Sequence, residues 1–334
     1  MAITIKHTEH ELMNNSVDIS VIIPMFNESE VLPICYERVS SILNELNRSY
    51  EIIFVDDGSK DDSAAIVEGL IAENPSIKLV SLSRNFGKEA ALTAGIEYVS
   101  GAATIIIDAD LQDPPELIPE MVETWERENV DVVLMRRKSR SGESVFKKLS
   151  AFFFYRILNL ISDFAIPTDT GDFRLMSRKA IEAVKSLPER NRYMKGILSW
   201  VGMDTVIIEY DRPVRVAGTV QQNYFRLLGL AIQGITSFSI APLRFAIFLG
   251  LLSATIGAGY GIWIIAKAIL WGDAVQGYPS MIAIITFLSG TQLFTIGILG
   301  EYVGKTYIES KQRPNYLVKK VNSSTNLYSP TDKY

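Results

Sequence analysis

Short apolar segments alternate with amphipathic ones over the first two hundred residues of the chain. Each apolar segment is rich in β-branched residues and is bounded by turn-forming residues, which is typical of a buried strand. Five strands are predicted on this pattern, at 19–26, 52–56, 77–82, 104–108 and 130–136. Four helices are predicted between them, at 30–46, 61–73, 88–99 and 115–128. This alternation predicts an α/β fold, a mostly parallel sheet with helices on both faces.

Two long uncharged segments follow in the last third of the chain. Residues 245–266 and 274–300 contain no Asp, Glu, Lys or Arg, and each is long enough to cross about 30 Å of hydrocarbon as a helix. Basic residues flank the pair on both sides, whereas the only charged residues in the connection between the two segments are Lys267 and Asp273. The positive-inside rule then puts both ends in the cytosol. A buried hairpin in a soluble core is the alternative, but core helices rarely run past about 14 uncharged residues.

Two further segments, at 146–164 and 224–238, combine aromatic and aliphatic residues with basic ones. This mixture predicts helices that lie on the membrane surface. For the segment at 146–164, packing against the soluble domain is the alternative, because apolar helix faces most often belong to a core. The first sixteen residues lack the basic start and apolar run of a signal peptide, so we expect the domain that follows to stay in the cytosol. Polar residues from about 322 onward predict a loose end.

These features predict five parts of the chain. The parts are a flexible tail at 1–16, a cytosolic catalytic domain at 17–210, a juxtamembrane segment at 211–243, a transmembrane hairpin of two helices at 244–303 and a cytosolic tail at 304–334.

Composition and charge exclude several classes of partner and site. The 334 residues carry 33 Lys and Arg against 38 Asp and Glu, a net charge of -5, without the basic excess that nucleic-acid binding requires. Cys35 is the one cysteine, and His7 and His10 are the two histidines. A disulfide within the chain and a Cys/His zinc cluster are therefore excluded, and any catalytic metal needs oxygen ligands. The sequence leaves a homo-oligomer open.

Acidic and amide side chains follow three of the predicted strands, in the segments 24–28, 56–59 and 108–113. The carboxyl ends of parallel strands meet at one edge of a sheet, where ligands bind in folds of this kind. Helix capping is the structural alternative for one such residue, and we expect it of Asp61. Convergence of three clusters favours a binding site.

The third cluster suits a metal. Two carboxylates, Asp108 and Asp110, precede the amide of Gln112, and such oxygen ligands suit a hard divalent cation that also binds substrate phosphates. The chain has no Gly-rich phosphate-binding loop, so basic side chains must help to neutralise the phosphates. Four are available, Arg84, Lys88, Arg136 and Arg137.

The chain also resembles a known family, on five ordered motifs, VIIPMFNE, VDDGSKDDS, LSRNFGKEAALTAGI, DADLQDPPE and DTGDFRLMSR. These resemble the inverting family 2 glycosyltransferases of the GT-A fold. More narrowly, they are similar to the polyprenyl-phosphate glycosyltransferases, the group that includes dolichol-phosphate mannose synthases and bactoprenol glucosyltransferases. The match covers about residues 17–310, with both apolar segments.

The resemblance implies a role for each matching residue. Nucleotide-sugar binding is implied for Pro24, Asn27, Glu28, Asp57, Arg84, Lys88, Asp108 and Arg136, with Asp57 on the base. Binding of Mg or Mn is implied for Asp108, Asp110 and Gln112. The place where sugar and acceptor meet is bordered by Asp169, Asp172 and Arg174, and the acceptor phosphate is bound by Arg174, Arg212 and Arg215. Similarity to the bacterial glucosyl branch rests on Asn191, Arg192 and Trp200.

One stretch departs from the family pattern. Val220, Gln221 and Gln222 stand where family members carry a hydroxyl residue, a lysine and an aromatic residue. If that lysine helps to hold the lipid phosphate, this chain lacks one cationic contact and depends more on Arg212 and Arg215.

The resemblance implies inverting transfer of glucose from UDP-glucose to undecaprenyl phosphate at the cytosolic face of a bacterial plasma membrane. A dianionic lipid phosphate needs no general base to attack the sugar. Another donor, such as GDP-mannose, UDP-N-acetylglucosamine or a UDP-linked amino sugar, is the alternative within the class. Outside this class, the alternatives are a non-catalytic nucleotide-binding membrane scaffold and a two-span pore subunit. The acidic clusters argue against a scaffold, and two spans without ionisable residues argue against a pore.

Overall fold

The computed structural model describes residues 17–138, 156, 170–189, 194–211, 235–236, 239–271 and 277–324. The chain divides into two compact units. One comprises Met1–Tyr155, Phe164–Gln222 and Pro314–Tyr334, and the other comprises Arg156–Asp163 and Asn223–Arg313. The chain therefore leaves the first unit, forms most of the second and returns to the first near its end.

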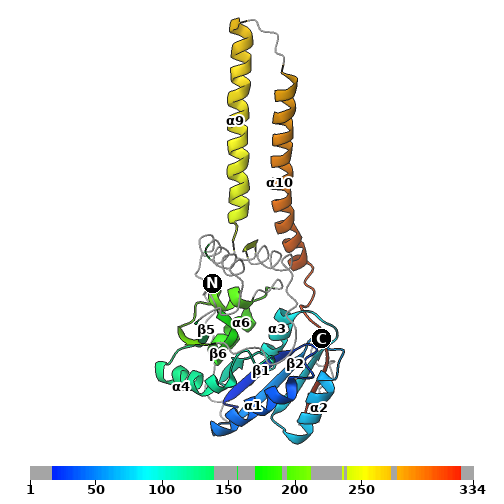
Figure 1. The fold of residues 1–334 in the computed structure, drawn as a ribbon, viewed down its shortest axis with the longest axis vertical. Coiled ribbons are helices and arrows are strands. Elements are labelled where there is room, and N and C mark those ends of the chain that lie inside the picture. Colours follow the sequence, from blue (N-terminus) through cyan, green and yellow to red (C-terminus); the bar gives the residue numbers. More distant parts are fainter. Residues whose placement is uncertain are drawn as a thin grey trace, which may run out of the picture. The chain divides into compact units, whose positions relative to one another are not determined.

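Within the described residues, the first unit contains an eight-stranded sheet in the order β7-β5-β6-β4-β1-β2-β3-β8. The strands are β1 (Ile19–Met25), β2 (Tyr50–Asp56), β3 (Ile77–Leu82), β4 (Ala103–Ile106), β5 (Val132–Arg137), β6 (Thr170–Ser177), β7 (Thr205–Tyr210) and β8 (Val318–Ser323). Strand β1 pairs in parallel with β2 and β4, β2 with β3, and β5 with β7. Strands β6 and β8 pair antiparallel with their neighbours. The predicted, mostly parallel sheet is confirmed (Figure 1).

Helices cover both faces of this sheet. They are α1 (Leu32–Glu45), α2 (Ser63–Glu73), α3 (Lys88–Tyr98), the short 3-10 helix η1 (Pro115–Leu117), α4 (Ile118–Glu128), α6 (Arg178–Ser186) and α7 (Met194–Trp200). Val21 and Ile23 of β1 belong to the core cluster that also contains buried residues of α1, α2 and α4. Ile22, between them, points to the other face, where a Cβ added to Gly95 of α3 would lie 2.5 Å from it. The alternation of side chains along a strand therefore divides the core into two layers.

The predicted elements of the first half are present, with ends that differ by a few residues. Strands β6 and β7 were not predicted; the motif DTGDFRLMSR overlaps β6, whereas no motif covers β7. Strand β8 corrects the start of the expected loose end, since Asn322 and Ser323 pair with β3; the rest of that end, 325–334, lies outside the described residues. Val321 is the one buried residue of this strand, and the rest is held mainly by backbone pairing, which a polar sequence does not reveal.

The second unit contains two long helices, α9 (Ala241–Trp271) and α10 (Tyr278–Ser310), which lie side by side (Figure 1). Ala241–Lys267 and Met281–Ser310 are long and apolar enough to cross a membrane. Their large apolar side chains are exposed, for example Ile247 at 71% and Ile269 at 77%. A continuous exposed apolar surface fits hydrocarbon better than water. The predicted surface helices at 146–164 and 224–238 and the tail at 1–16 lie outside the described residues, apart from 156 and 235–236.

Candidate active site

The loops that follow β1 and β2 are joined by hydrogen bonds. Asn27, which has a φ of 55°, accepts a hydrogen bond from the backbone N of Lys60 at 2.8 Å. In return, the N of Asn27 donates to Oγ of Ser59 at 3.0 Å, and the N of Glu28 donates to Oγ of Ser63 at 3.0 Å. The two loops therefore form one rim at the carboxyl ends of these strands.

Asp61 differs from its predicted role as a helix cap. Helix α2 begins at Ser63, and Asp62 occupies the capping position without a side-chain hydrogen bond. The carboxylate of Asp61 instead accepts from the N of Ser63 at 3.1 Å and from the N of Ser29 at 3.1 Å. Asp61 therefore satisfies the first helical N–H from one position further upstream and ties the helix to the loop after β1.

Asp57 holds the loop between β3 and α3. Its side chain is 4% exposed, and its two oxygens accept hydrogen bonds from the N of Phe86 at 2.7 Å and the N of Gly87 at 2.8 Å. Burial raises the pKa of Asp57 although these two donors oppose the shift. Gly58 allows the loop to approach, because a Cβ there would lie 2.5 Å from the carbonyl carbon of Arg84. The role on the base that we predicted for Asp57 stays a prediction beside this structural one.

Arg84 lies in the same loop. Its guanidinium carbon lies 4.2 Å from the centre of the Phe86 ring, and it donates to the carbonyl of Asn85 at 3.2 Å. The loop therefore presents a cation beside the rim. Pro24, within β1, is paired with Val55 of β2 in the sheet and lies three residues before Asn27.

The segment 108–113 forms a turn after β4 in which exposure alternates. Asp108, Asp110 and Gln112 are half-buried, whereas the residues between them and Asp113 are buried. The turn depends on a left-handed backbone at Leu111, with φ of 55°, and on a hydrogen bond from the N of Gln112 to Asp110 at 3.1 Å. The three predicted metal ligands therefore share one accessible side of the turn.

These three side chains fit a hard divalent cation in donor type, because all offer oxygen. Among the described residues, no group of three His, Cys, Asp or Glu side chains could hold a metal ion. The protein would thus supply two carboxylates and an amide here, Asp108, Asp110 and Gln112, and leave further positions to substrate oxygens.

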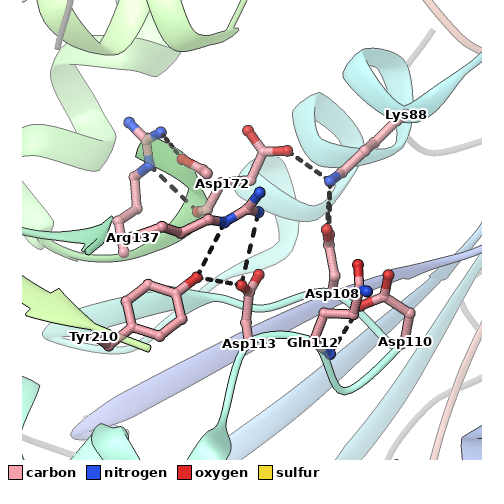
Figure 2. A network of polar contacts seen from close by, with 10 residues as sticks. Lys88, Asp108, Asp110, Gln112, Asp113, Arg137, Asp172 and Tyr210 are labelled. Carbon is pink, nitrogen blue, oxygen red and sulfur yellow. Dashed lines mark hydrogen bonds and ion pairs between the residues drawn. The ribbon is translucent and has the colours of Figure 1, made fainter. Parts of the chain in front are cut away.

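Lys88, the first residue of α3, bridges two carboxylates. Its Nζ lies 2.7 Å from Oδ1 of Asp108 and 2.6 Å from Oδ2 of Asp172 (Figure 2). Desolvation alone would lower the pKa of Lys88, but the two carboxylates outweigh it and raise the pKa above its usual value. Lys88 therefore stays charged and joins the turn after β4 to strand β6.

Arg174, two residues after Asp172 on β6, is buried, at 4% exposure. Its Nη2 donates to the carbonyl of Gly171 at 2.8 Å and its Nε donates to the carbonyl of Asp172 at 3.3 Å. Burial lowers the pKa of Arg174, against the attraction of Asp172 and Glu89. A role on the acceptor phosphate stays a prediction, and these two bonds leave further N–H groups of the guanidinium for it. The other residues predicted for the acceptor side, Asp169, Arg212, Arg215 and the stretch 220–222, lie outside the described residues.

The two arginines at the end of β5 point in different directions. Arg136, predicted to bind the nucleotide sugar, forms an ion pair with Glu209 on β7. Arg137 lies in the network with Asp113 and Tyr210 that Figure 2 shows. Successive strand residues face opposite sides of a sheet, so Arg137 is the one that faces the turn after β4. Nucleotide-sugar binding by Arg136 stays a prediction beside its ion pair with Glu209.

Sequence reasoning missed two residues of this network. The hydroxyl of Tyr210 donates to Oδ1 of Asp113 at 2.5 Å, and Nη2 of Arg137 lies 3.9 Å from the same oxygen. Asp113 stands within the acidic motif, so its position was a signal for it, whereas Tyr210 ends a strand that was not predicted. Trp200 ends α7 and is 54% exposed, and its two predicted companions, Asn191 and Arg192, lie outside the described residues.

The predicted gathering at one edge of the sheet is present among the described residues. Asp57 binds the loop that ends in Gly87, Lys88 follows directly, and Lys88 in turn contacts Asp108 and Asp172. A continuous series of polar contacts thus runs from the rim after β2 to β6. The arrangement offers carboxylate and amide oxygens for a cation and nearby basic groups for phosphates.

Comparison with known proteins gives matches along most of the chain. The family described as Glycosyl transferase family 2 matches residues 20–185, and the family described as GtrB C-terminal hairpin matches residues 241–306. The prophage bactoprenol glucosyl transferase homolog of Escherichia coli (strain K12) is 47% identical over 91% of this chain and 99% of its own.

Two more relatives cover similar shares. The bactoprenol glucosyl transferase of Shigella phage SfV is 48% identical over 90% of this chain and 98% of its own. The uncharacterized glycosyltransferase YkcC of Bacillus subtilis (strain 168) is 41% identical over 92% of this chain and 95% of its own. Among solved structures, glucosyl-3-phosphoglycerate synthase of Mycobacterium tuberculosis has a TM-score of 0.46 and 20% identity, over 66% of this chain and 78% of that one.

Proposed function

Because this chain belongs to glycosyl transferase family 2, we propose that it transfers glucose from UDP-glucose to undecaprenyl phosphate, with inversion at the anomeric carbon. The observation that carries the proposal is the match to relatives named bactoprenol glucosyl transferase, which extends through both the sheet unit and the C-terminal hairpin. The turn at 108–113 after β4, called the acidic turn below, and its basic neighbours at the edge of the sheet support the same reaction.

The donor is assigned to the rim after β1, β2 and β4. A divalent cation bound by Asp108, Asp110 and Gln112 would neutralise the charge that develops on the leaving diphosphate. Arg137 lies within electrostatic reach of Asp108, Arg84 lies in the loop that Asp57 holds, and guanidinium groups pair well with phosphate oxygens. Asp57 keeps the Arg84 loop in position through its two backbone hydrogen bonds.

The acceptor supplies the nucleophile. An oxygen of the dianionic lipid phosphate attacks C1 of glucose, the new C1–O bond forms with that oxygen's electron pair, and the bond from C1 to the diphosphate breaks. UDP leaves with the bonding electrons, so no proton transfer is needed at this step. We assign to Lys88 and Asp172 the border between donor and acceptor, because Lys88 joins Asp172 to the donor-side Asp108.

The order of the two units along the chain supports a cytosolic catalytic domain. Strand β7 precedes the hairpin and β8 follows it, and both belong to one sheet. If α9 and α10 each cross the membrane, this sheet must lie on the side where α9 begins and α10 ends. Lys305, Lys311 and Arg313 near the end of α10 favour the cytosol for that side.

A transfer assay with purified full-length protein in liposomes tests the proposal. We expect radiolabel from UDP-glucose to enter the lipid phase when undecaprenyl phosphate and Mn²⁺ are present. Asp110→Asn should lower the rate by more than about a hundredfold, because one ligand charge at the diphosphate is lost. Glu120→Gln, which removes one exposed carboxylate of α4, is the matched control and should leave the rate unchanged.

Two results would count against the proposal. Lipid labelling by GDP-mannose, UDP-N-acetylglucosamine or a UDP-linked amino sugar in place of UDP-glucose would replace the donor and keep the reaction class. Full activity of Asp110→Asn would remove the cation site from the mechanism.

A further inference from the structure

Tyr210 contacts three elements around the turn after β4. It is 4% exposed, and its hydroxyl donates to Oδ1 of Asp113 at 2.5 Å. The Nε of Arg137, at the end of β5, donates to the same hydroxyl at 3.5 Å. The ring packs edge-on against Phe173 of β6, with centroids 6.0 Å apart. One side chain at the end of β7 thus connects β5, β6 and the acidic turn, and Figure 2 shows its contacts with Arg137 and Asp113.

The acidic turn needs such a connection. Leu111 is held in a left-handed conformation, with φ of 55°, which a branched side chain adopts only when its surroundings enforce it. Leu111 is 1% exposed and Asp113 is fully buried, so both anchor the turn from its inner side. Asp110 and Gln112 lie on the outer side, and the described bond between them lies within the turn. Asp113 directly follows Gln112 in this turn, so the contacts that hold Asp113 bear on the conformation of the outer side.

We propose that Tyr210 is a positioning residue for this glycosyltransferase: through Asp113 it fixes the turn that carries Asp110 and Gln112 for the divalent cation and the donor diphosphate. The inference rests on the proposed function, because it takes that turn as the cation site. Tyr210 does not reach the cation itself, since its hydroxyl is used by Asp113 and Arg137.

Tyr210→Phe isolates this role. The substitution keeps the ring that packs on Phe173 and removes only the hydroxyl. We expect the affinity for Mn²⁺ in the presence of UDP to fall about tenfold or more, because a hydrogen bond to a charged partner is lost at the base of the turn. The KM for undecaprenyl phosphate should stay unchanged. Tyr50→Phe is the matched control, because its hydroxyl donates to Asn44 at 2.9 Å near the start of β2, and it should bind Mn²⁺ normally.

Mn²⁺ binding is measured on the full chain in detergent, from the free-ion signal in electron paramagnetic resonance with UDP present. Asp113→Asn is measured in the unaltered and in the Tyr210→Phe background. If the two side chains act through one hydrogen bond, Asp113→Asn should weaken Mn²⁺ binding less in the Tyr210→Phe background. Equal effects in both backgrounds, or unchanged binding by Tyr210→Phe, would overturn the inference. A loss of Mn²⁺ binding in Tyr50→Phe as large as that in Tyr210→Phe would also overturn the inference, because the loss would then not be specific to the hydrogen bond with Asp113.

Glucose transfer to undecaprenyl phosphate by the unaltered chain is measured in parallel. Intact Mn²⁺ binding without transfer would count against the proposed function alone. Transfer together with unchanged Mn²⁺ binding by Tyr210→Phe would count against the role of Tyr210 alone. Failure of the unaltered chain to bind Mn²⁺ with UDP would overturn both.

Discussion

Gly58→Ala tests how the donor-side loops fit together. Gly58 has a φ of +73°, and a Cβ there would lie 2.5 Å from the carbonyl carbon of Arg84 and 2.8 Å from the N of Asn85. Both are backbone atoms that cannot rotate away. The loop from Arg84 to Gly87 would therefore have to move by about 1 Å to reach ordinary contact distances.

The expected loss of stability follows from two contributions. An alanine in a left-handed conformation costs about 1–2 kcal/mol. Movement of the loop breaks at least one of the two hydrogen bonds that Asp57 accepts from Phe86 and Gly87, and a hydrogen bond to a charged group contributes about 1.5–3 kcal/mol. Gly58→Ala should therefore lower the free energy of unfolding by about 2.5–5 kcal/mol.

The assay uses urea unfolding of the full chain in detergent, followed by the fluorescence of Trp125 on α4. The other three of the four tryptophans are replaced by phenylalanine, so that the signal reports the sheet unit. Gly69→Ala is the matched control, since it adds the same methyl group within α2, where nothing lies within 4 Å. It should raise the free energy of unfolding by about 0.5–1 kcal/mol. Equal stability of Gly58→Ala and the unaltered chain would refute the reasoning.

Three further predictions concern the edge of the sheet, a buried carboxylate and the membrane. Val321→Asp puts a charge at a position of β8 that is 8% exposed and should lower the free energy of unfolding by about 1–3 kcal/mol. Lys319→Asp, at an exposed position of the same strand, is the control and should leave the free energy of unfolding unchanged. Burial would raise the pKa of Glu51, but hydrogen bonds from Lys78, Ser20 and Ser100 outweigh it and lower the pKa. Its stabilising effect is therefore full above the ordinary pKa of a glutamate and is lost as the pH falls through the lowered one, so the stability gap between the unaltered chain and Glu51→Gln should close there. Asn326→Cys should resist a membrane-impermeant thiol reagent in intact cells, because the reagent does not reach a cytosolic C-terminus. The only other thiol, Cys35, is buried with its pKa raised to about 12 and gives no background, so rapid labelling would contradict a cytosolic C-terminus.

The sheet could be predicted where the pattern of residues reflects burial. Strands β1 to β5 are apolar and alternate with helices, so their places were visible in the sequence. Strand β8 was not, because its backbone pairs with β3 while Val321 alone of its side chains is buried. The same limit applies to β7, whose exposed and half-buried residues alternate along an edge.

The sequence predicts those parts of the site that depend only on residue type and on where a strand ends. The acidic clusters gather as expected. The contact of Lys88 with Asp108 was not predicted, because β1 and β2 separate β3 from β4 in the sheet. Whether Arg136 or Arg137 faces the turn after β4 depends on the face of the sheet that each side chain takes. The sequence does not fix this, because a shift of one residue in strand pairing exchanges the two faces. The partners of Asp57 are backbone N–H groups of a loop thirty residues away, and side-chain motifs carry no signal for such a partner.

The anomeric configuration of the lipid product tests the central claim most directly. The full chain is incubated in liposomes with UDP-α-glucose, undecaprenyl phosphate and Mn²⁺, and the extracted lipid is examined by proton NMR for the coupling at C1 of the sugar. Single displacement by the lipid phosphate predicts a β-linked glucosyl phosphate. An α-linked product, or no glucosyl lipid at all, would contradict the account.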